Sequence, residues 1–405
     1  MMEVIPILAA LRRNRLGAFL IAIQIALTVA VLCNGAFIIR QRVKLIERPT
    51  GVEEANLFVI HNEWIGASQD LTSKSSADLA DLRALPGVVD AYATTSYPLS
   101  NWGNTWSISL RARQRHRSLA AAYFADNHAL RTLGLRLIAG RNFDAEEVTA
   151  LTAISGRPPS AVIVTRDLAR KVFSSDSPVG RYVYSSGLRL QIVGVVSKLQ
   201  VPWTAAGGWG STFNEDSMLI PIQPDTPSSI YVVRTRPGDL PAVMRAAQKA
   251  LYSIDPGRIL SGVQSLTEAR HAAYRDDRGF VIVLSIVCLL VAAVTALGIV
   301  GLTSYWVAQR RRQIGIRRAL GATRPAILRY FQTENLMIAA AGGIAGIALG
   351  LGANMWMVES FQMPRMPPGY LLVGFAVVLA LTQLAAFWPA LKASATPPAL
   401  ATRSA

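Results

Sequence analysis

Four long apolar segments constrain the fold of this chain more than any other feature of its sequence. Each is long enough to cross a lipid bilayer as a helix, which takes about 20 consecutive apolar residues. A mean hydropathy of +0.32 with only 16 % charged residues is typical of a protein with several membrane spans. The sequence therefore predicts a membrane protein with four transmembrane α-helices, at residues 16–39, 280–307, 331–358 and 370–391.

Positive charges beside these segments predict their orientation. Three arginines precede the first segment, seven arginines and no acidic residue lie at 309–330 between the second and the third, and Lys392 and Arg403 follow the fourth. Loops that carry Lys and Arg next to membrane spans stay in the cytoplasm. We therefore expect both termini and the loop 309–330 to be cytoplasmic, and residues 41–278 to lie outside the cytoplasm.

The location of the positive charge also argues against a nucleic-acid partner. The formal net charge is +16, and a basic excess can indicate binding to nucleic acid. Residues 1–40 and 279–405, however, carry 14 Lys and Arg against 3 Asp and Glu. Most of the excess thus lies beside the apolar segments, where the retention of Lys and Arg on the cytoplasmic side of the membrane lipid explains it. We expect no nucleic-acid partner.

The long region 41–278 is predicted to be a mixed α+β domain. "EANLFVIHN" is typical of a strand, "SADLADLRALPG" of a helix and "VVDAYATTSY" of a second strand. The same order returns in "SIYVVRTRPG", "DLPAVMRAAQKALYSIDPG" and "RILSGVQSL", and both helices end at Pro-Gly. This repetition predicts a duplicated split β-α-β layout, with a different block of strands and a helix inserted between the two units.

The segments that join this domain to the membrane also have helical patterns. After the first apolar segment, "RQRVKLIER" continues a helical pattern until Pro49. Before the second apolar segment, Ser265 and Glu268 have the spacing of a capping box, which marks the start of a helix. We expect residues 16–48 and 265–308 each to form a membrane span that extends outward as a stalk.

The sequence lacks the common patterns of catalytic and metal-binding sites. Its four histidines are not paired at metal-ligand spacing, and neither the P-loop pattern G-x-x-x-x-G-K-[ST] nor G-x-S-x-G occurs. We therefore expect a non-catalytic membrane subunit that itself binds no metal and no cofactor. A membrane-anchored enzyme is disfavoured for the same reason.

The arginine-rich loop is predicted to form a helix, a turn and a second helix. The first helix runs from Arg310 to Leu320, and Gly321 suits a helix stop. Thr323 suits the N-cap of the next helix, with Pro325 in its first turn. The second helix should lead directly into the third apolar segment.

Three glycines in the third apolar segment predict close helix packing. Gly342, Gly346 and Gly350 recur at four-residue spacing. Small residues on one helical face let helices approach closely in lipid. This face could pack against another helix of the same chain or against a second copy, and the sequence leaves both alternatives open.

Most of these segments resemble a known family. "RRRQIGIRRALGATRPAILRYFQTENLMIAAAGGIAGIALG" closely resembles the FtsX-like permease signature of MacB-type ABC transporters. "LGLRLIAGRNF", "AVIVTRDLARKVFSSDSPVGRYV", "IVGVVSKL" and "LYSIDPGRIL" resemble the MacB-type periplasmic core domain, and "WPALKASATPPALATR" resembles the family's C-terminal ending. Gln313 departs from the pattern, because the family usually has Glu there; this departure is compatible with a degenerate subunit of a heterodimer.

The resemblance implies partners and a docking site. In this family the segment between the second and third spans docks on the nucleotide-binding subunit. The chain would form a dimer of permeases, as a homodimer or a heterodimer, with separate ABC ATPase subunits that bind ATP and Mg and with a periplasmic adaptor (membrane fusion protein) as a further partner. The residues implied in ATPase docking are Arg310, Arg311, Arg312, Gln313, Ile314, Gly315, Arg317, Arg318, Leu320, Gly321, Ala322 and Thr323.

The resemblance also implies a layout and a function. The protein would be a permease of the bacterial inner membrane that couples ATP hydrolysis by the separate ATPase to movement of its periplasmic domain, and so exports an antibiotic, a peptide or lipid-linked cargo. The alternative is mechanotransmission, in which the movement regulates a periplasmic enzyme or sensor without transport. The expected parts are a cytoplasmic segment (1–15), the first span with its stalk (16–48), a periplasmic core domain (49–264) with a porter-like split β-α-β lobe and an inserted lobe at about 119–224, a stalk with the second span (265–308), the coupling segment (309–330), the third span (331–358), a periplasmic loop (359–369), the fourth span (370–391) and a cytoplasmic tail (392–405).

Overall fold

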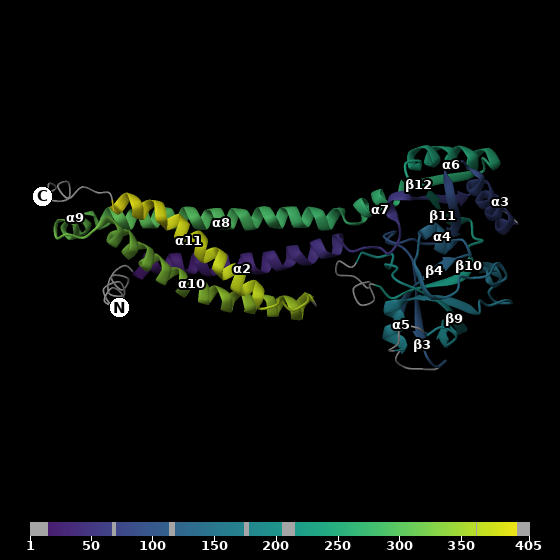
Figure 1. Ribbon diagram of the computed structural model, residues 1–405, viewed down its shortest axis with the longest axis horizontal. Helices are drawn as coiled ribbons and strands as arrows, with labels where there is room; N and C mark the ends of the chain where they lie inside the picture. Colours follow the sequence, from purple (N-terminus) through teal and green to yellow (C-terminus); the bar gives the residue numbers. More distant parts are fainter. Residues whose placement is uncertain are drawn as a thin grey trace. The chain divides into compact units, whose positions relative to one another are not determined.

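The chain forms two compact units in a computed structural model (Figure 1). The helical unit consists of residues 1–44 and 278–405, and the α+β unit consists of residues 45–277. The structure describes residues 15–66, 70–112, 118–173, 178–204, 215–361 and 363–394. Most of the predicted N-terminal segment and of the predicted cytoplasmic tail lies outside the described residues.

All four predicted spans lie in helices that are long and apolar enough to cross a membrane. A helix rises 1.5 Å per residue, so the 32 residues of the first one cover about 48 Å, more than the hydrocarbon core of about 30 Å. A short helix separates the second span from the third. The helices are α2 (Arg15–Ile46), α8 (Arg275–Gln309), α9 (Arg311–Ala319), α10 (Arg324–Phe361) and α11 (Gly369–Ser394).

The first helix, α2, contacts each of the other three long helices. The hydroxyl oxygens of Thr28 on α2 and Thr295 on α8 lie 2.6 Å apart and share a hydrogen bond. The rings of Phe37 on α2 and Tyr370 on α11 meet edge to face, with centroids 5.4 Å apart. α10 packs against α2 through its glycines. The core of this unit therefore surrounds α2.

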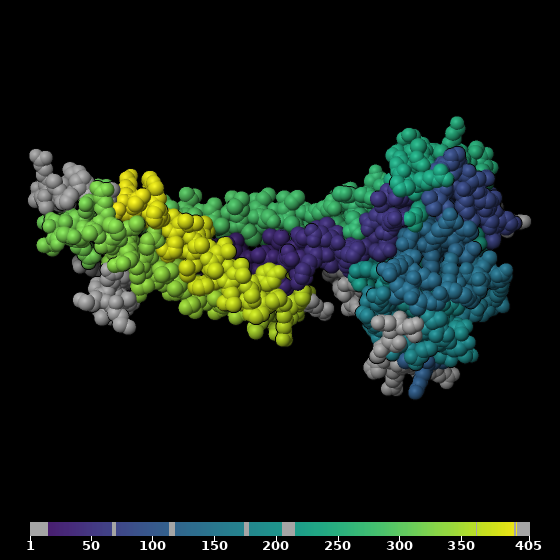
Figure 2. Space-filling model, viewed as in Figure 1, coloured from purple at the N-terminus to yellow at the C-terminus, as the bar shows by residue number. Residues whose placement is uncertain are grey.

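In contrast, α8 leaves most of its apolar surface uncovered. Leu289 and Leu297 are each 71 % exposed. Figure 2 shows α8 in green as an outer edge of the helical unit. In a bilayer, such a surface lies against lipid chains or against another apolar helix.

The first lobe of the α+β unit has the predicted split β-α-β layout. Its four strands follow the order β12-β1-β11-β2, and each neighbouring pair is antiparallel. The helices α3 and α6 each connect two of these strands, and Phe58, Leu82 and Val243 pack between the sheet and the helices. The elements are β1 (Leu57–Trp64), α3 (Leu71–Ala84), β2 (Val88–Thr94), β11 (Ser228–Thr235), α6 (Leu240–Ile254) and β12 (Arg258–Ser265).

The second lobe is a sheet that closes on itself. Its strands follow the order β4-β3-β8-β9-β7-β10-β6, and the additional pairing of β4 with β10 closes the sheet on itself. The lobe begins earlier than the predicted residue 119, because β3 pairs with both β4 and β8. The elements are β3 (Asn104–Ser109), β4 (Ser118–Ala125), α4 (Ala129–Leu133), β5 (Leu137–Gly140), η2 (Ala145–Glu147), β6 (Thr149–Ala150), η3 (Leu151–Ala153), β7 (Ala161–Thr165), α5 (Arg166–Phe173), β8 (Tyr182–Ser185), β9 (Leu188–Val196) and β10 (Ser217–Gln223).

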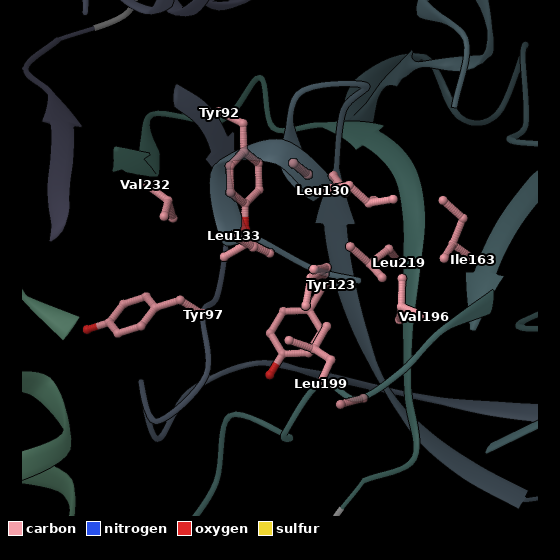
Figure 3. Close-up of a cluster of buried hydrophobic side chains, with 14 of the residues drawn as sticks. Tyr92, Tyr97, Tyr123, Leu130, Leu133, Ile163, Val196, Leu199, Leu219 and Val232 are labelled. Carbon is pink, nitrogen blue, oxygen red and sulfur yellow. The ribbon is translucent and has the colours of Figure 1, made fainter. Parts of the chain in front are cut away.

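One hydrophobic core joins the two lobes (Figure 3). Tyr92 and Val232 come from the first sheet, and Tyr123 and Leu219 come from the second. The Thr94 hydroxyl also donates a hydrogen bond of 2.9 Å across the junction, to the carbonyl oxygen of Phe124. Because their buried side chains interlock in this way, the two lobes form one packed body.

The two connections to the membrane helices differ in structure. α2 runs without interruption to Ile46, and η1 (Glu54–Asn56) precedes β1. The predicted second stalk is instead divided into α7 (Leu266–Ala273) and α8, with Tyr274 between them. The predicted capping box at the start of α7 is present: the Ser265 hydroxyl accepts from the Glu268 amide, and the Glu268 carboxylate accepts from the Ser265 amide.

Candidate functional site

The candidate site is the segment 309–330, called the elbow from here on, which runs from the last residue of α8 through α9 into the start of α10. α9 ends at Ala319, and Gly321 follows two residues later with a φ of +95°, which favours glycine. The amide of Ala322 donates to the carbonyl of Arg317 at 3.0 Å, and the amide of Gly321 donates to that of Arg318 at 3.1 Å. These two bonds form a Schellman motif, which stops the helix and turns the chain.

The second helix of the elbow starts where the sequence predicts. The hydroxyl of Thr323 accepts a 3.4 Å hydrogen bond from the amide of Ala326. Pro325 lies in the first turn of α10, where its missing amide proton costs no hydrogen bond. α10 then continues through the third span without a break, so the second helix of the elbow and the span are one helix.

The inner face of α9 is packed against three other helices. Ile314 is 5 % exposed and lies in a cluster with Val307 of α8, Ile327 and Phe331 of α10, and Ala390 of α11. Burying an isoleucine side chain contributes about 2 kcal/mol. α9 is therefore fixed to the ends of the spans.

A buried ion pair fixes the break between α8 and α9. Nη1 of Arg310 lies 2.9 Å and 3.0 Å from the two carboxylate oxygens of Glu334 on α10. The Arg310 side chain is 15 % exposed and the Glu334 side chain 3 %. Glu334 was not among the residues predicted from the sequence, although an acidic residue inside an apolar segment is by itself a signal of function.

Two further arginines of the predicted docking set also contact the spans. The Arg317 guanidinium lies over the ring of Tyr330, 4.9 Å from its centroid. Nη1 of Arg318 donates to the carbonyl oxygen of Ser394 at 3.3 Å. These contacts hold part of the positive charge of the elbow against α10 and α11.

The outer face of α9 combines arginines with exposed apolar side chains. Ile316 is 48 % exposed and Leu320 is 82 % exposed, and their i, i+4 spacing places them on one side of the helix. Arg312 lies four residues before Ile316 and Arg317 directly after it, and both arginines are exposed. Ile316 was not predicted as a docking residue, although its spacing from Leu320 is a signal that could have found it.

The predicted docking residues therefore divide into three groups. Ile314 and Gly315 are buried within the chain and present no surface to a partner. Arg310, Arg318 and Ala322 are half-buried. The exposed members are Arg311, Arg312, Gln313, Arg317, Leu320, Gly321 and Thr323.

The three glycines of α10 face α2 of the same chain. A Cβ added to Gly342 would lie 2.6 Å from the carbonyl oxygen of Ala22, and one added to Gly346 would lie 2.7 Å from that of Ala26. The carbonyl of Gly350 accepts a 3.1 Å hydrogen bond from the side-chain amide of Asn34. This glycine face is therefore occupied within the chain.

The side chains of the described ranges do not form a metal site. Within those ranges, no three His, Cys, Asp or Glu side chains are grouped so that they could hold a metal ion. The elbow consists mainly of arginine and apolar residues.

Two known families match the chain over most of its length. Residues 18–250 match the MacB-like periplasmic core domain, and residues 285–398 match the FtsX-like permease C-terminal domain. The elbow lies inside the second match.

Individual relatives are distant. The chain is 26 % identical over 279 residues to the macrolide export ATP-binding/permease protein MacB of Rhodospirillum rubrum, which covers 65 % of this chain and 40 % of that protein. It is 23 % identical over 287 residues to the uncharacterized ABC transporter permease YknZ of Bacillus subtilis, with 68 % and 65 % covered. The chain thus spans less than two thirds of the length of both relatives.

A solved structure also matches the chain. The periplasmic region of MacB from Actinobacillus actinomycetemcomitans aligns with 13 % identity and a TM-score of 0.33, covering 56 % of this chain and 97 % of that one. The assignment to a family rests on the sequence matches, since the periplasmic-core match alone covers more than half of the chain. This chain belongs to the family of ABC transporter permeases that combine a MacB-like periplasmic core domain with an FtsX-like permease C-terminal domain, and it is a membrane protein with an extracytoplasmic domain.

Proposed function

We propose that this chain is the permease subunit of an ABC transporter, and that a separate cytoplasmic ATPase docks on its elbow and moves its periplasmic domain. ATP and Mg²⁺ would be bound by that ATPase. The observation that carries the proposal is the asymmetry of α9. Its inner face is packed on the spans through Ile314, while its outer face exposes Ile316 and Leu320 beside arginines.

The outer face of α9 is chemically suited to bind a pocket of the ATPase that has an apolar base and acidic residues at its rim. Apolar area contributes roughly 25 cal/mol per Å² when a partner covers it. Arginines at the rim of an interface attract acidic residues, accelerate association and fix the register of the partners. A docked ATPase could then exert force on the spans, because Arg310 and Ile314 tie α9 to them.

The proposed orientation places the elbow and both termini in the cytoplasm and the α+β unit in the periplasm, in the inner membrane of a bacterium. The arginine-rich elbow supports this orientation, since cationic loops beside spans are retained inside. The match of residues 18–250 to a periplasmic core domain agrees with it. The split β-α-β lobe would act as the porter-like part of that domain.

Export is the proposed consequence of the movement, with an antibiotic, a peptide or lipid-linked cargo as substrate. The name of the Rhodospirillum rubrum relative, a macrolide export protein, favours an antibiotic-like molecule. A second copy of a permease would complete the transporter, and the exposed apolar surface of α8 supplies a face for lipid or for that copy. If no cargo crosses the membrane while ATP is consumed, mechanotransmission is the function instead.

The test measures the affinity between the full-length chain, in lipid nanodiscs, and the P-loop ATPase that co-purifies with it. We expect the Ile316→Ser/Leu320→Ser variant to bind about 100-fold more weakly, because two exposed anchor residues carry much of such an interface. The matched control is Ile65→Ser/Ile259→Ser. It removes apolar side chains that are 64 % and 49 % exposed in the α+β unit.

The control should bind the ATPase like the wild type. The proposal is contradicted if no P-loop ATPase co-purifies, or if the elbow variant keeps wild-type affinity.

A further inference from the structure

The α+β unit is connected to the membrane helices at two places in the chain, and one side chain lies between them. The first connection is the segment from Ile46 to Asn56, which follows α2; the second connection is α7, which precedes α8. Arg270 on α7 points at the first connection. We propose that Arg270 is a positioning residue that binds the two connections together, so that they move as one. The two connections, residues 46–56 and 266–273, are called the joint from here on.

The hydrogen bonds of Arg270 cross from the second connection to the first. Nη1 donates to the carbonyl oxygen of Ile46 at 2.8 Å, and Nη2 donates to that of Arg48 at 3.0 Å. Nε and Nη2 donate to the two carboxylate oxygens of Glu54, at 2.6 Å and 2.5 Å. The flat, five-donor guanidinium makes all four of these hydrogen bonds at once, whereas an ammonium group has only three N–H donors.

The contact with Ile46 has a specific physical role. Ile46 is the last residue of α2, and the carbonyls of a last helical turn lack partners within the helix. A cation at this end also interacts favourably with the helix dipole. Arg270 thus holds the C-terminal end of the first membrane helix directly, in addition to the loop that follows it.

The carboxylate of Glu54 completes the joint. Burial by itself raises the pKa of Glu54, but the hydrogen bonds from Arg270 and Thr50 outweigh burial and lower it. The Thr50 hydroxyl donates to Glu54 at 2.5 Å. The side chains of Arg270 and Glu54 are only 16 % and 20 % exposed, so solvent screens this ion pair little.

The second connection is anchored in the core that joins the two lobes. Leu266 and Ala269 of α7 belong to that core. Tyr274 is 1 % exposed, and its hydroxyl accepts a 3.0 Å hydrogen bond from the side-chain amide of Gln200. The hydroxyl of Tyr123, a core residue in Figure 3, donates to the carbonyl of the same glutamine. A displacement of the joint therefore reaches both lobes together.

This inference extends the proposed function, because a joint is useful only if the membrane helices move. Its test nevertheless reads the joint within the chain itself and needs no ATPase. Failure of the joint and failure of ATPase docking are therefore separate results.

The test uses spin labels in the full-length chain in nanodiscs, with Cys33 and Cys288 replaced by alanine. One label pair, Glu47→Cys with Asp81→Cys, reports the first connection against the surface of α3. The other pair, Asp276→Cys with Asp81→Cys, reports the start of α8, directly after the second connection, against the same surface. All three labelled positions are exposed. Double electron–electron resonance gives the distribution of each distance.

With Arg270 present, both distributions should be narrow. Arg270→Gln should broaden the Glu47–Asp81 distribution by about twofold, because the end of α2 loses its ties and explores more positions. The Asp276–Asp81 distribution should stay narrow, since Leu266 and Tyr274 still hold α7. Arg270→Lys should give an intermediate width for the first pair.

The control is Arg141→Gln, which breaks a paired ion contact with Glu147 elsewhere in the α+β unit. It should leave both distributions unchanged. The joint is overturned if Arg270→Gln leaves the first pair as narrow as in the wild type. Equal broadening of both pairs also overturns it, because the domain would then have loosened as a whole. If Arg270→Gln does not fold, the same two distance distributions are measured in Arg270→Lys and in Glu54→Gln. The joint is overturned if neither variant broadens the Glu47–Asp81 distribution more than the Asp276–Asp81 distribution.

Discussion

The elbow and the joint hold helices in similar ways but differ in what they leave exposed. Each contains an arginine–glutamate pair that is at least partly buried, Arg310 with Glu334 at the elbow and Arg270 with Glu54 at the joint. At the joint, the arginine also meets two backbone carbonyls. At the elbow, the outer face of α9 exposes Leu320 and several arginines.

The contrast indicates which contacts are permanent. Groups that are already bonded within the chain gain little from a partner, whereas exposed apolar side chains gain from being covered. The joint is therefore a fixed internal connection, and we infer that the elbow is the surface at which an outside protein acts. Three predictions test this contrast.

The largest effect is expected at the ion pair of the elbow. Arg310→Gln should destabilise the helical unit by about 3 kcal/mol, because it leaves the buried carboxylate of Glu334 without its cation. Unfolding of the full-length chain in mixed detergent, titrated with a denaturing surfactant, measures the change.

A second variant separates charge from packing at this pair. Arg310→Gln/Glu334→Gln should recover most of the lost stability, because no uncompensated charge remains buried. If Arg310→Gln is as stable as the wild type, the ion pair does not hold the elbow. The elbow and the joint would then not be held in similar ways.

The next effect concerns the path between the elbow and the joint. α10 starts in the elbow, α2 ends at the joint, and Gly346 lies where the two helices meet. Gly346→Ala should cost about 2 kcal/mol, because its Cβ would lie 2.7 Å from both Ala26 and Val29. The same surfactant titration measures it.

Gly352 on α10 supplies the matched control. A Cβ there would meet nothing within 4 Å, so Gly352→Ala should leave stability unchanged or raise it slightly. Equal losses in the two variants would mean that the α2–α10 contact is not tight, and that the elbow and the joint lack this direct link.

The smallest effect is the pH dependence of the joint. The pKa of Glu54 is lowered in the folded chain, so its ionised form contributes stability above its unfolded pKa of about 4.5. That contribution, about 1–2 kcal/mol, is lost as the pH falls through the lower folded pKa. Thermal unfolding of the full-length wild type and Glu54→Gln, compared from pH 7 downward, measures it.

The melting temperatures of the wild type and of Glu54→Gln should converge as the pH falls. A difference in melting temperature that stays constant with pH would show that the charge of Glu54 does not stabilise the joint. The neutral carbonyl contacts of Arg270 would then carry it alone.

The parts of this structure that could be predicted are those whose signals lie within the segment itself. Gly321 and Pro325 act through their own backbone preferences, and Thr323 acts through a hydrogen bond to an amide only three residues away. The helix–turn–helix of the elbow therefore follows from the sequence. The split β-α-β lobe follows from alternating strand and helix patterns with Pro-Gly stops. The α10 glycines predicted close packing, but only the fold shows that their partner is α2 of the same chain.

Contacts between distant segments could not be predicted in this way. Arg270 binds a carbonyl of Ile46, which carries no sequence signal because every residue has one. The closure of the second lobe depends on the pairing of β4 with β10, which lie about a hundred residues apart in the chain. Arg310 meets Glu334 only because the elbow folds back on the spans.

The sharpest test of ATPase docking is a photo-crosslink from the elbow. A photoreactive amino acid replaces Leu320 in the full-length chain, and a second variant carries it at Ile259 in the α+β unit. After illumination of whole cells, mass spectrometry identifies the attached proteins. We predict a P-loop ATPase attached at position 320 and absent at 259. An ATPase attached only at 259, or none at 320 in cells that contain the folded chain, would contradict the docking of an ATPase on the elbow.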